Sequence, residues 1–255
     1  MRGESLYEAL GEGVREACEG YGSVALAFSG GLDSSVIAAF TRDTTSVITY
    51  TVGYASSQDL TNAQEASGTL GLSWVPIELE DSLLVREARS LLRHFPGLDP
   101  VTLSFELPLW ILLDRCSDTV VLAGQGADEL FGGYAKYQRL EGGALQKALD
   151  RDLELLMMET VPREREMAGH RGRILKLPYC HPRVMSIVLS LSTEEKVGPR
   201  GKEALRRVAR QLDLPEFLVQ RPKKAVQYGS GVMKRLKGLA KAERMGVADF
   251  VLSLG

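Results

Sequence analysis

Short apolar runs alternate with helical patterns through the first half of the sequence. The apolar runs span residues 23–28, 74–77 and 119–122, and residues 46–52 form a further run, rich in the β-branched residues that favour strands, in which Ser, Thr and Tyr outnumber the aliphatic residues. Between these runs, apolar residues recur at helical spacing over 34–40, 58–70, 82–94 and 103–116. Strands separated by helices of this length predict βαβ units and a parallel sheet, and chiefly apolar strands predict a sheet that helices cover on both faces.

Beyond residue 134 the strand pattern stops. Helical patterns follow at residues 144–160, 183–191, 202–212 and 231–240. We therefore expect an α/β part over residues 1–135 and a mostly helical part over residues 136–255, which packs on the sheet as one integrated domain. The charged run RERE at residues 163–166 is expected to form the solvated face of a helix.

Composition excludes several classes of protein. With 255 residues the chain can bury a substantial core without metal ions or disulfides. Its formal net charge of −2 argues against a nucleic-acid coat protein, and its three well-separated cysteines argue against a disulfide framework or a zinc ribbon. No apolar run approaches the roughly 18 residues of a membrane span. We therefore expect a cytoplasmic protein that binds neither membranes nor nucleic acids.

A glycine-rich segment, SGGLDSS at residues 29–35, lies between the first expected strand and the helix that follows. Adjacent glycines let the backbone turn sharply and approach a ligand, and the start of a helix offers unpaired N–H groups to an anion. Asp33 would repel a phosphate group unless a divalent cation bridges the two. The segment therefore predicts a phosphate site with a metal ion; the alternative is an ordinary turn in which Asp33 caps the helix.

A second glycine-rich segment, AGQGADELFGGY at residues 123–134, follows the fourth expected strand. It brings Asp128 to the carboxyl edge of the sheet, where open α/β folds bind ligands. Paired with Asp33, Asp128 could hold a divalent cation on a phosphate group; the alternative is a loop carboxylate that caps the next helix. The patterns GxxxxGK(S/T) and GxGxxG are absent, so a P-loop kinase or a dinucleotide oxidoreductase is not supported.

Residues 29–35 resemble the pyrophosphate-binding loop of the N-type ATP pyrophosphatases, which adenylate substrates and release pyrophosphate. Within that superfamily, residues 123–134 resemble the signature of the synthetase domain of asparagine synthetase. The resemblance extends over nearly the whole chain. Two further segments carry it: VG at 52–53 followed by SQDL at 57–60, and RPK at 221–223 followed by Gly229 and Gly231.

This resemblance implies a parallel-sheet ATP pyrophosphatase fold, of the adenine nucleotide alpha hydrolase-like type, with a mostly helical C-terminal half. It implies an ATP-dependent amide-forming synthetase, which activates a carboxylate as an acyl-adenylate and then transfers the acyl group to ammonia or another amine. The residues implied to bind ATP are Ala27, Ser29, Gly30, Gly31, Asp33, Ser34, Val52, Asp59 and Gly124, with Mg²⁺ on Asp33 and Asp128. Those implied in catalysis are Lys223, Glu129 and Gln125. The ammonium of Lys223, rather than that of Lys224, would stabilise charge that develops between the α- and β-phosphates.

Several residues depart from the asparagine synthetase pattern. Arg2 follows Met1 where those enzymes expose a nucleophilic cysteine, and about 22 residues precede the first expected strand, so we expect no glutamine hydrolysis by this chain. The nitrogen would come from free ammonia, from a separate glutaminase or from another amine. Gln125 stands where asparagine synthetases usually have Glu, and His181 where they usually have Asp; both are expected on the acceptor side. The acceptor is therefore expected to be aspartate or an analogous carboxylate.

The sequence leaves two other functions open. A PP-loop enzyme that modifies tRNA would share the phosphate loop, although such enzymes often use catalytic cysteines and this sequence has no CxxC pair. A non-catalytic ATP-binding homologue would keep the phosphate loop and lose the acceptor chemistry. The substitutions at Gln125 and His181 are the features that favour this second alternative.

Overall fold

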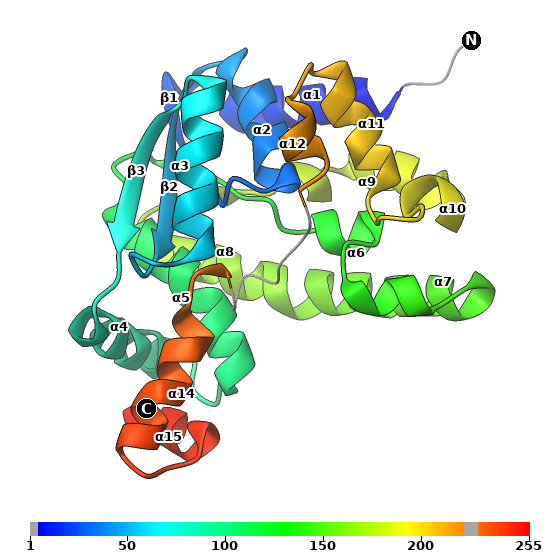
Figure 1. Ribbon diagram of the computed structural model, residues 1–255. Coiled ribbons are helices and arrows are strands. Elements are labelled where there is room, and N and C mark those ends of the chain that lie inside the picture. Colours follow the sequence, from blue (N-terminus) through cyan, green and yellow to red (C-terminus); the bar gives the residue numbers. More distant parts are fainter. Residues whose placement is uncertain (1–4, 222–228) are drawn as a thin grey trace.

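The computed structural model of the chain describes residues 5–221 and 229–255. Within these residues the strands are β1 (Ser23–Ala27), β2 (Ser46–Gly53), β3 (Ser73–Glu78), β4 (Val120–Leu122) and β5 (Ile174–Lys176). The α-helices are α1 (Leu6–Cys18), α2 (Leu32–Arg42), α3 (Gln58–Leu70), α4 (Asp81–His94), α5 (Pro100–Arg115), α6 (Ala127–Phe131), α7 (Gly142–Leu155), α8 (Val161–His170), α9 (Pro182–Ser190), α10 (Thr193–Lys196), α11 (Glu203–Gln211), α12 (Glu216–Val219), α14 (Val232–Ala242) and α15 (Val247–Leu254) (Figure 1). The 3₁₀ helices are η1 (Ala135–Arg139) and η3 (Pro178–Cys180), and η2 (Leu156–Thr160) is a π-helix.

The strands form one parallel sheet in the order β3-β2-β1-β4-β5, which confirms the predicted fold class. Ala25 of β1 lies opposite Ile48 of β2 and Val121 of β4, so one register runs across the middle of the sheet. The chain builds outward from β1 in one direction first and then in the other. The loops after β1 and β4 therefore separate at the point where the order reverses, and in open α/β sheets that point forms the ligand crevice.

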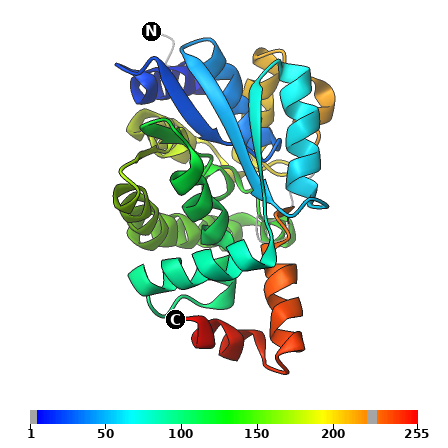
Figure 2. The same ribbon diagram turned by 90° about the vertical axis from the view of Figure 1, so that its left-hand side faces the viewer.

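Helices cover both faces of the sheet (Figure 2). Val24 and Leu26 of β1 pack into a core with α1, α2, α3, α9 and α11, whereas Ala25 packs into a second core with α4, α5, α8, α14 and α15. Successive side chains of a strand point to opposite faces, so both faces of β1 enter a core. This arrangement explains why the strand is apolar throughout instead of alternating with polar residues.

The predicted helix over residues 58–70 coincides with α3, which Ser57 caps at its start and Gly71, with φ of 65°, ends in the left-handed region. The sequence patterns do not predict helix α1 or strand β5. β5 has three residues, too few to show a period, and it is recognisable as a strand only because it pairs with β4. The mostly helical second half of the chain thus supplies one edge of the sheet.

Candidate functional site

The loop between β1 and α2 forms a turn that can bind an anion. Gly30 has a φ of 66° and lies so close to α3 that a Cβ there would be 2.3 Å from the backbone oxygen of Asn62. Gly31 is the N-cap of α2 and has no side chain to cap the helix, so the first N–H groups of α2 can donate to a ligand. The hydroxyls of Ser29 and Ser34 lie 3.4 Å apart beside it. A turn of this kind before a helix start offers its N–H groups and hydroxyls to an anion.

The loop after β4 meets this turn. It bends at Gly126, which has a φ of 92° and is the N-cap of α6. Asp128 and Glu129 lie in the first turn of α6, as Asp33 lies in the first turn of α2, so these carboxylates do not cap their helices. A Cβ at Gly124 would be 3.5 Å from the Cβ of Asp33, which shows how closely the two loops approach. The capping alternatives for Asp33 and Asp128 are therefore wrong.

A buried lysine joins the carboxylates of the two loops. The ammonium of Lys202 lies 2.7 Å and 2.6 Å from the two carboxylate oxygens of Asp33 and 2.6 Å from Oδ1 of Asp128. Only 4% of the Lys202 side chain is exposed. Its backbone has a φ of 60°, its N–H donates to the carbonyl of Phe131, and its Cε occupies space that a Cβ at Gly133 would fill. Sequence reasoning missed this residue, because 169 positions separate it from Asp33 and no local pattern connects them.

The carboxylates of Asp33 and Asp128 fit the ligand set of a magnesium ion. Oxygens of both side chains lie within 2.7 Å of one point, the Lys202 nitrogen, so a single cation can contact both. Mg²⁺ is usually held by one or two carboxylates and completes its octahedron with phosphate oxygens and water. No group of three or more His, Cys, Asp or Glu side chains suited to a metal occurs in the described part of the chain.

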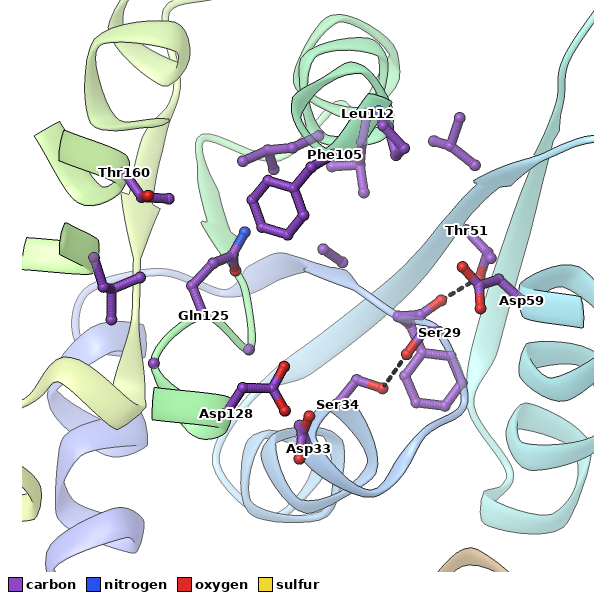
Figure 3. A pocket seen from close by; sticks show the side chains of 18 of the residues that line it. Ser29, Asp33, Ser34, Thr51, Asp59, Phe105, Leu112, Gln125, Asp128 and Thr160 are labelled. Carbon is purple, nitrogen blue, oxygen red and sulfur yellow. Dashed lines mark hydrogen bonds between the residues drawn. The ribbon is translucent and has the colours of Figure 1, made fainter. Parts of the chain in front are cut away.

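The two loops line a cavity of about 490 Å³ (Figure 3). Ser34, Asp33 and Asp128 lie on one side of it, and Phe105 and Leu112 of α5 lie across from them. Charged and hydroxyl groups thus face an apolar wall. A ligand that combines an anionic group with a flat apolar ring matches this division.

The cavity collects most of the predicted site residues. Those that line it are Ala27, Ser29, Asp33, Ser34, Val52, Asp59, Gly124, Gln125, Asp128 and Glu129. Gly30 and Gly31 shape the phosphate loop without lining the cavity. The predicted catalytic residue Lys223 lies outside the described residues.

The described residues that flank positions 222–228 contact the site. Arg221 donates hydrogen bonds to the carbonyls of Gly30 at 2.6 Å and Asn62 at 3.2 Å, so it braces the phosphate loop against α3. A Cβ at Gly229 would be 2.2 Å from a carboxylate oxygen of Asp59, so a side chain there would have to displace that carboxylate. The segment that resembles the late Arg-x-Lys loop therefore begins and ends against the predicted nucleotide site.

Gln125 and Arg163 form another part of the cavity wall, with two buried glutamates behind them. Nε2 of Gln125 donates to Glu164 at 2.8 Å, and Nε of Arg163 donates to Glu106 at 2.7 Å. Burial raises the pKa of both carboxyl groups, and that of Glu164 rises further because Glu106 is close. The second oxygen of each carboxyl accepts no hydrogen bond from residues 5–221 or 229–255.

The prediction that residues 163–166 form a solvated face is wrong for Arg163 and Glu164. Glu164 lies on the same face of α8 as the buried Val161 and Ala168, and this face packs on α5. Arg163 is 19% exposed and turns toward the cavity. The π-helix η2, which precedes α8, adds Leu156 and Thr160 to the same wall, and π-turns are frequent at functional sites.

Glu129 and Tyr134 form a hydrogen-bonded pair in the cavity wall. The Tyr134 hydroxyl donates to Glu129 at 2.5 Å. Burial, together with the charge of Glu129, raises the pKa of Tyr134, so its hydroxyl keeps its proton at neutral pH. The pair therefore presents an ionisable carboxylate whose position is fixed by a neutral donor.

Cys180 and His181 lie behind the wall. Burial raises the pKa of Cys180 to about 12, so this thiol keeps its proton at neutral pH and packs as a largely apolar group. His181 is the N-cap of α9 and points to α1, where its Nε2 lies 3.2 Å from a carboxylate oxygen of Glu16 and its ring packs on Gly13. The prediction that His181 lines the acceptor side is wrong, because α9 packs its start against α1.

Comparisons with known proteins place the chain among synthetases. The sequence profile of the family described as asparagine synthase matches residues 5–143 and 138–245. The chain is 30% identical to putative asparagine synthetase (glutamine-hydrolyzing) 1 of Methanocaldococcus jannaschii, over 93% of this chain and 51% of that protein. It is 24% identical to asparagine synthetase B (glutamine-hydrolyzing) of Escherichia coli K12, over 89% of this chain and 44% of that protein. The chain spans about half the length of these relatives.

Among solved structures, the NMN synthetase of Francisella tularensis aligns with 98% of this chain and 89% of its own, with a TM-score of 0.48 and 12% identity. In the described part of the chain, every helix is too short or too polar to cross a bilayer.

Proposed function

The chain belongs to the asparagine synthase family, and from that premise we propose that it is an ATP-dependent ligase that forms an amide through an acyl-adenylate. The observation that carries this proposal is the meeting of the Gly30–Gly31 turn with the Asp33 and Asp128 carboxylates at the edge of one cavity. A bound ATP would set its phosphates on the start of α2 and its base against the apolar wall beside Val52. The acceptor carboxylate would then reach the α-phosphate from the Gln125 side.

In the first proposed step, a carboxylate oxygen of the acceptor attacks the α-phosphorus of ATP. The bond from that phosphorus to the bridging oxygen breaks, and pyrophosphate leaves with the electron pair. The N–H groups at the start of α2 and the hydroxyls of Ser29 and Ser34 bind the pyrophosphate as its charge develops. Magnesium, when bound by Asp33 and Asp128, would neutralise part of that charge. The same role is proposed for the Lys223 ammonium from its place in the RPK segment alone.

In the second proposed step, an amine attacks the acyl carbon and AMP leaves with the electron pair of the broken C–O bond. Nε2 of Gln125 donates to Glu164, so the side-chain oxygen Oε1 of Gln125 can accept an N–H from the amine. Glu129 is proposed to accept the proton that the amine loses. The proposed acceptor is aspartate or an analogue. Arg163 donates its Nε–H to Glu106, and its other N–H groups can donate to a carboxylate of the acceptor.

For the nitrogen donor we propose ammonia or a small amine. The relatives described above carry the description glutamine-hydrolyzing, and a separate glutaminase is a proposed partner of this chain. Incubation with unlabelled ammonia and amide-¹⁵N glutamine distinguishes the donors. We expect unlabelled amide; ¹⁵N in the amide product of the purified chain would refute the proposal.

An ATP–pyrophosphate exchange screen over carboxylic acids, beginning with aspartate, tests the proposed reaction. We expect magnesium-dependent exchange with at least one acid. Asp33→Asn should lower the exchange rate at least about a hundredfold, which corresponds to about 2.7 kcal/mol of transition-state stabilisation. Asp43→Asn, at the exposed end of the same helix, is the matched control and should change it little.

The same screen separates the alternatives. Binding of MgATP without exchange for any acid would indicate the non-catalytic ATP-binding homologue. Release of AMP that requires added tRNA would indicate the tRNA-modifying enzyme.

A further inference from the structure

Lys202 occupies the position that a metal ion would need. Its ammonium makes short contacts with both oxygens of Asp33 and with Oδ1 of Asp128, and these are the atoms assigned above to magnesium. A metal ion that bridges the same carboxylates must therefore break at least one of the contacts between the ammonium and Asp33 or Asp128.

The surrounding backbone fixes the lysine in this place. A φ of 60° is rare for a residue with a side chain, and the Lys202 N–H is held by the carbonyl of Phe131 at 3.0 Å. The Lys202 side chain packs against Gly133, where an added Cβ would lie 2.1 Å from the Cε of Lys202. The ammonium is almost fully buried, and charges so removed from water persist only where opposite charges hold them. The contact is thus built into the fold and is more than a chance pairing of surface groups.

We propose that Lys202 is the resident counter-ion of the ligand-free site. It holds the carboxylates of Asp33 and Asp128 together at a separation suited to a metal, and it keeps Mg²⁺ out until ATP arrives with phosphate oxygens. The identity of the metal rests on the function proposed above. Because Mg²⁺ gives up its water reluctantly and completes its shell with phosphate, the bare ion competes poorly with a buried ammonium, whereas the MgATP complex brings further ligands for both cations. Lys202 acts through the carboxylates and is a positioning residue.

The test measures Mg²⁺ binding to the full chain without nucleotide, by calorimetry and by thermal unfolding. In Lys202→Met the carboxylates lose the ammonium between them, so the variant should unfold about 6 °C or more below the wild type. Mg²⁺ alone should bind the variant at least about tenfold more tightly than the wild type and restore part of the lost stability. Lys196→Met, at a buried lysine of α10 that does not contact this pair, is the matched control and should leave Mg²⁺ binding unchanged.

A double variant keeps the test decisive if Lys202→Met folds poorly. Asp33→Asn with Lys202→Met removes one carboxylate as well as the ammonium, so it should be more stable than the single variant and gain no Mg²⁺ affinity. A Lys202→Met protein that folds only with added Mg²⁺ is also an expected result.

The inference is overturned if Lys202→Met binds Mg²⁺ no more tightly than the wild type does. These measurements contain neither ATP nor acceptor, so they are independent of the exchange screen. A chain that shows the expected Mg²⁺ response without exchange would keep the counter-ion role of Lys202 and lose the proposed reaction.

Discussion

Replacing Gly30 by alanine should destabilise the protein far more than the same change at its neighbour Gly31. The backbone at Gly30 has a positive φ, and a Cβ there would lie 2.3 Å from the oxygen and 2.5 Å from the carbon of the Asn62 carbonyl. Neither atom belongs to a flexible side chain, so the loop or helix α3 must move. At Gly31 the φ is −81°, and the nearest atom to a new Cβ is the Ser29 hydroxyl oxygen at 3.3 Å.

The two changes differ by a sum of known effects. At position 30, a side chain in the left-handed region costs about 1 kcal/mol or more, and overpacking against fixed backbone adds roughly 1–3 kcal/mol. The total is about 3 kcal/mol. At position 31, alanine is a poorer N-cap than glycine, at a cost of up to about 1 kcal/mol. For a chain of this size, about 3 kcal/mol corresponds to a fall in melting temperature of roughly 6–12 °C.

Urea denaturation and thermal unfolding of Gly30→Ala, Gly31→Ala and the wild type measure this difference. Gly30→Ala should also weaken MgATP binding, because the carbonyl of this residue accepts the Arg221 hydrogen bond that braces the loop. Equal losses of stability in the two variants, or a loss below about 1 kcal/mol for Gly30→Ala, would refute the close approach of this loop to α3.

Further predictions concern titration, reactivity and the chemical step. The raised pKa of Glu164 means that the folded protein binds its proton more tightly than the unfolded chain, so this residue's contribution to stability is full below the ordinary carboxyl pKa and falls as pH rises toward the folded pKa. In urea titrations Glu164→Gln should therefore gain stability relative to the wild type as the pH rises above the ordinary carboxyl pKa, whereas the exposed control Glu166→Gln should not. Parallel curves for Glu164→Gln and the wild type would contradict a raised pKa at Glu164. Iodoacetamide should label Cys180 at pH 8 at least about a hundredfold more slowly in the folded than in the unfolded protein, as mass spectrometry would show, since little thiolate exists at a pKa of about 12; similar rates would argue against its burial. Lys223→Ala should slow single-turnover pyrophosphate release about a hundredfold with less than about a fivefold change in ATP affinity, while Lys224→Ala changes little; the reverse order would shift the alignment of that segment by one residue.

The parts of the fold that the sequence predicts well are those encoded by local patterns. The sheet strands β1 and β4 are chiefly apolar runs, and β2 is rich in β-branched residues. The loops that follow β1 and β4 carry the glycines that a sharp turn at the sheet edge requires. Asp33 and Asp128 could be paired in advance because the carboxyl ends of parallel strands share one edge. The three-residue strand β5 carries no comparable pattern and becomes visible only through its pairing with β4.

The parts that could not be predicted depend on contacts between distant segments. Lys202 begins what looks in sequence like an ordinary amphipathic helix, and its role follows from where α11 starts against the two loops. Arg163 and Glu164 look like members of a solvated charge run, but the contact of α8 with α5 buries one and turns the other into the cavity. Glu106 lies in an apolar helix, and its partner Arg163 is 57 residues away in the sequence, so no local pattern connects the two.

Transfer of ¹⁸O from the acceptor carboxylate tests the central claim most directly. Once the exchange screen has identified an acid that reacts, that acid is labelled with ¹⁸O in its carboxylate and converted in a single turnover with the amine. If an acyl-adenylate forms, one labelled oxygen per amide made must appear in the phosphate of AMP, and none in pyrophosphate. Formation of ADP with ¹⁸O in inorganic phosphate, or AMP without label, would contradict the account.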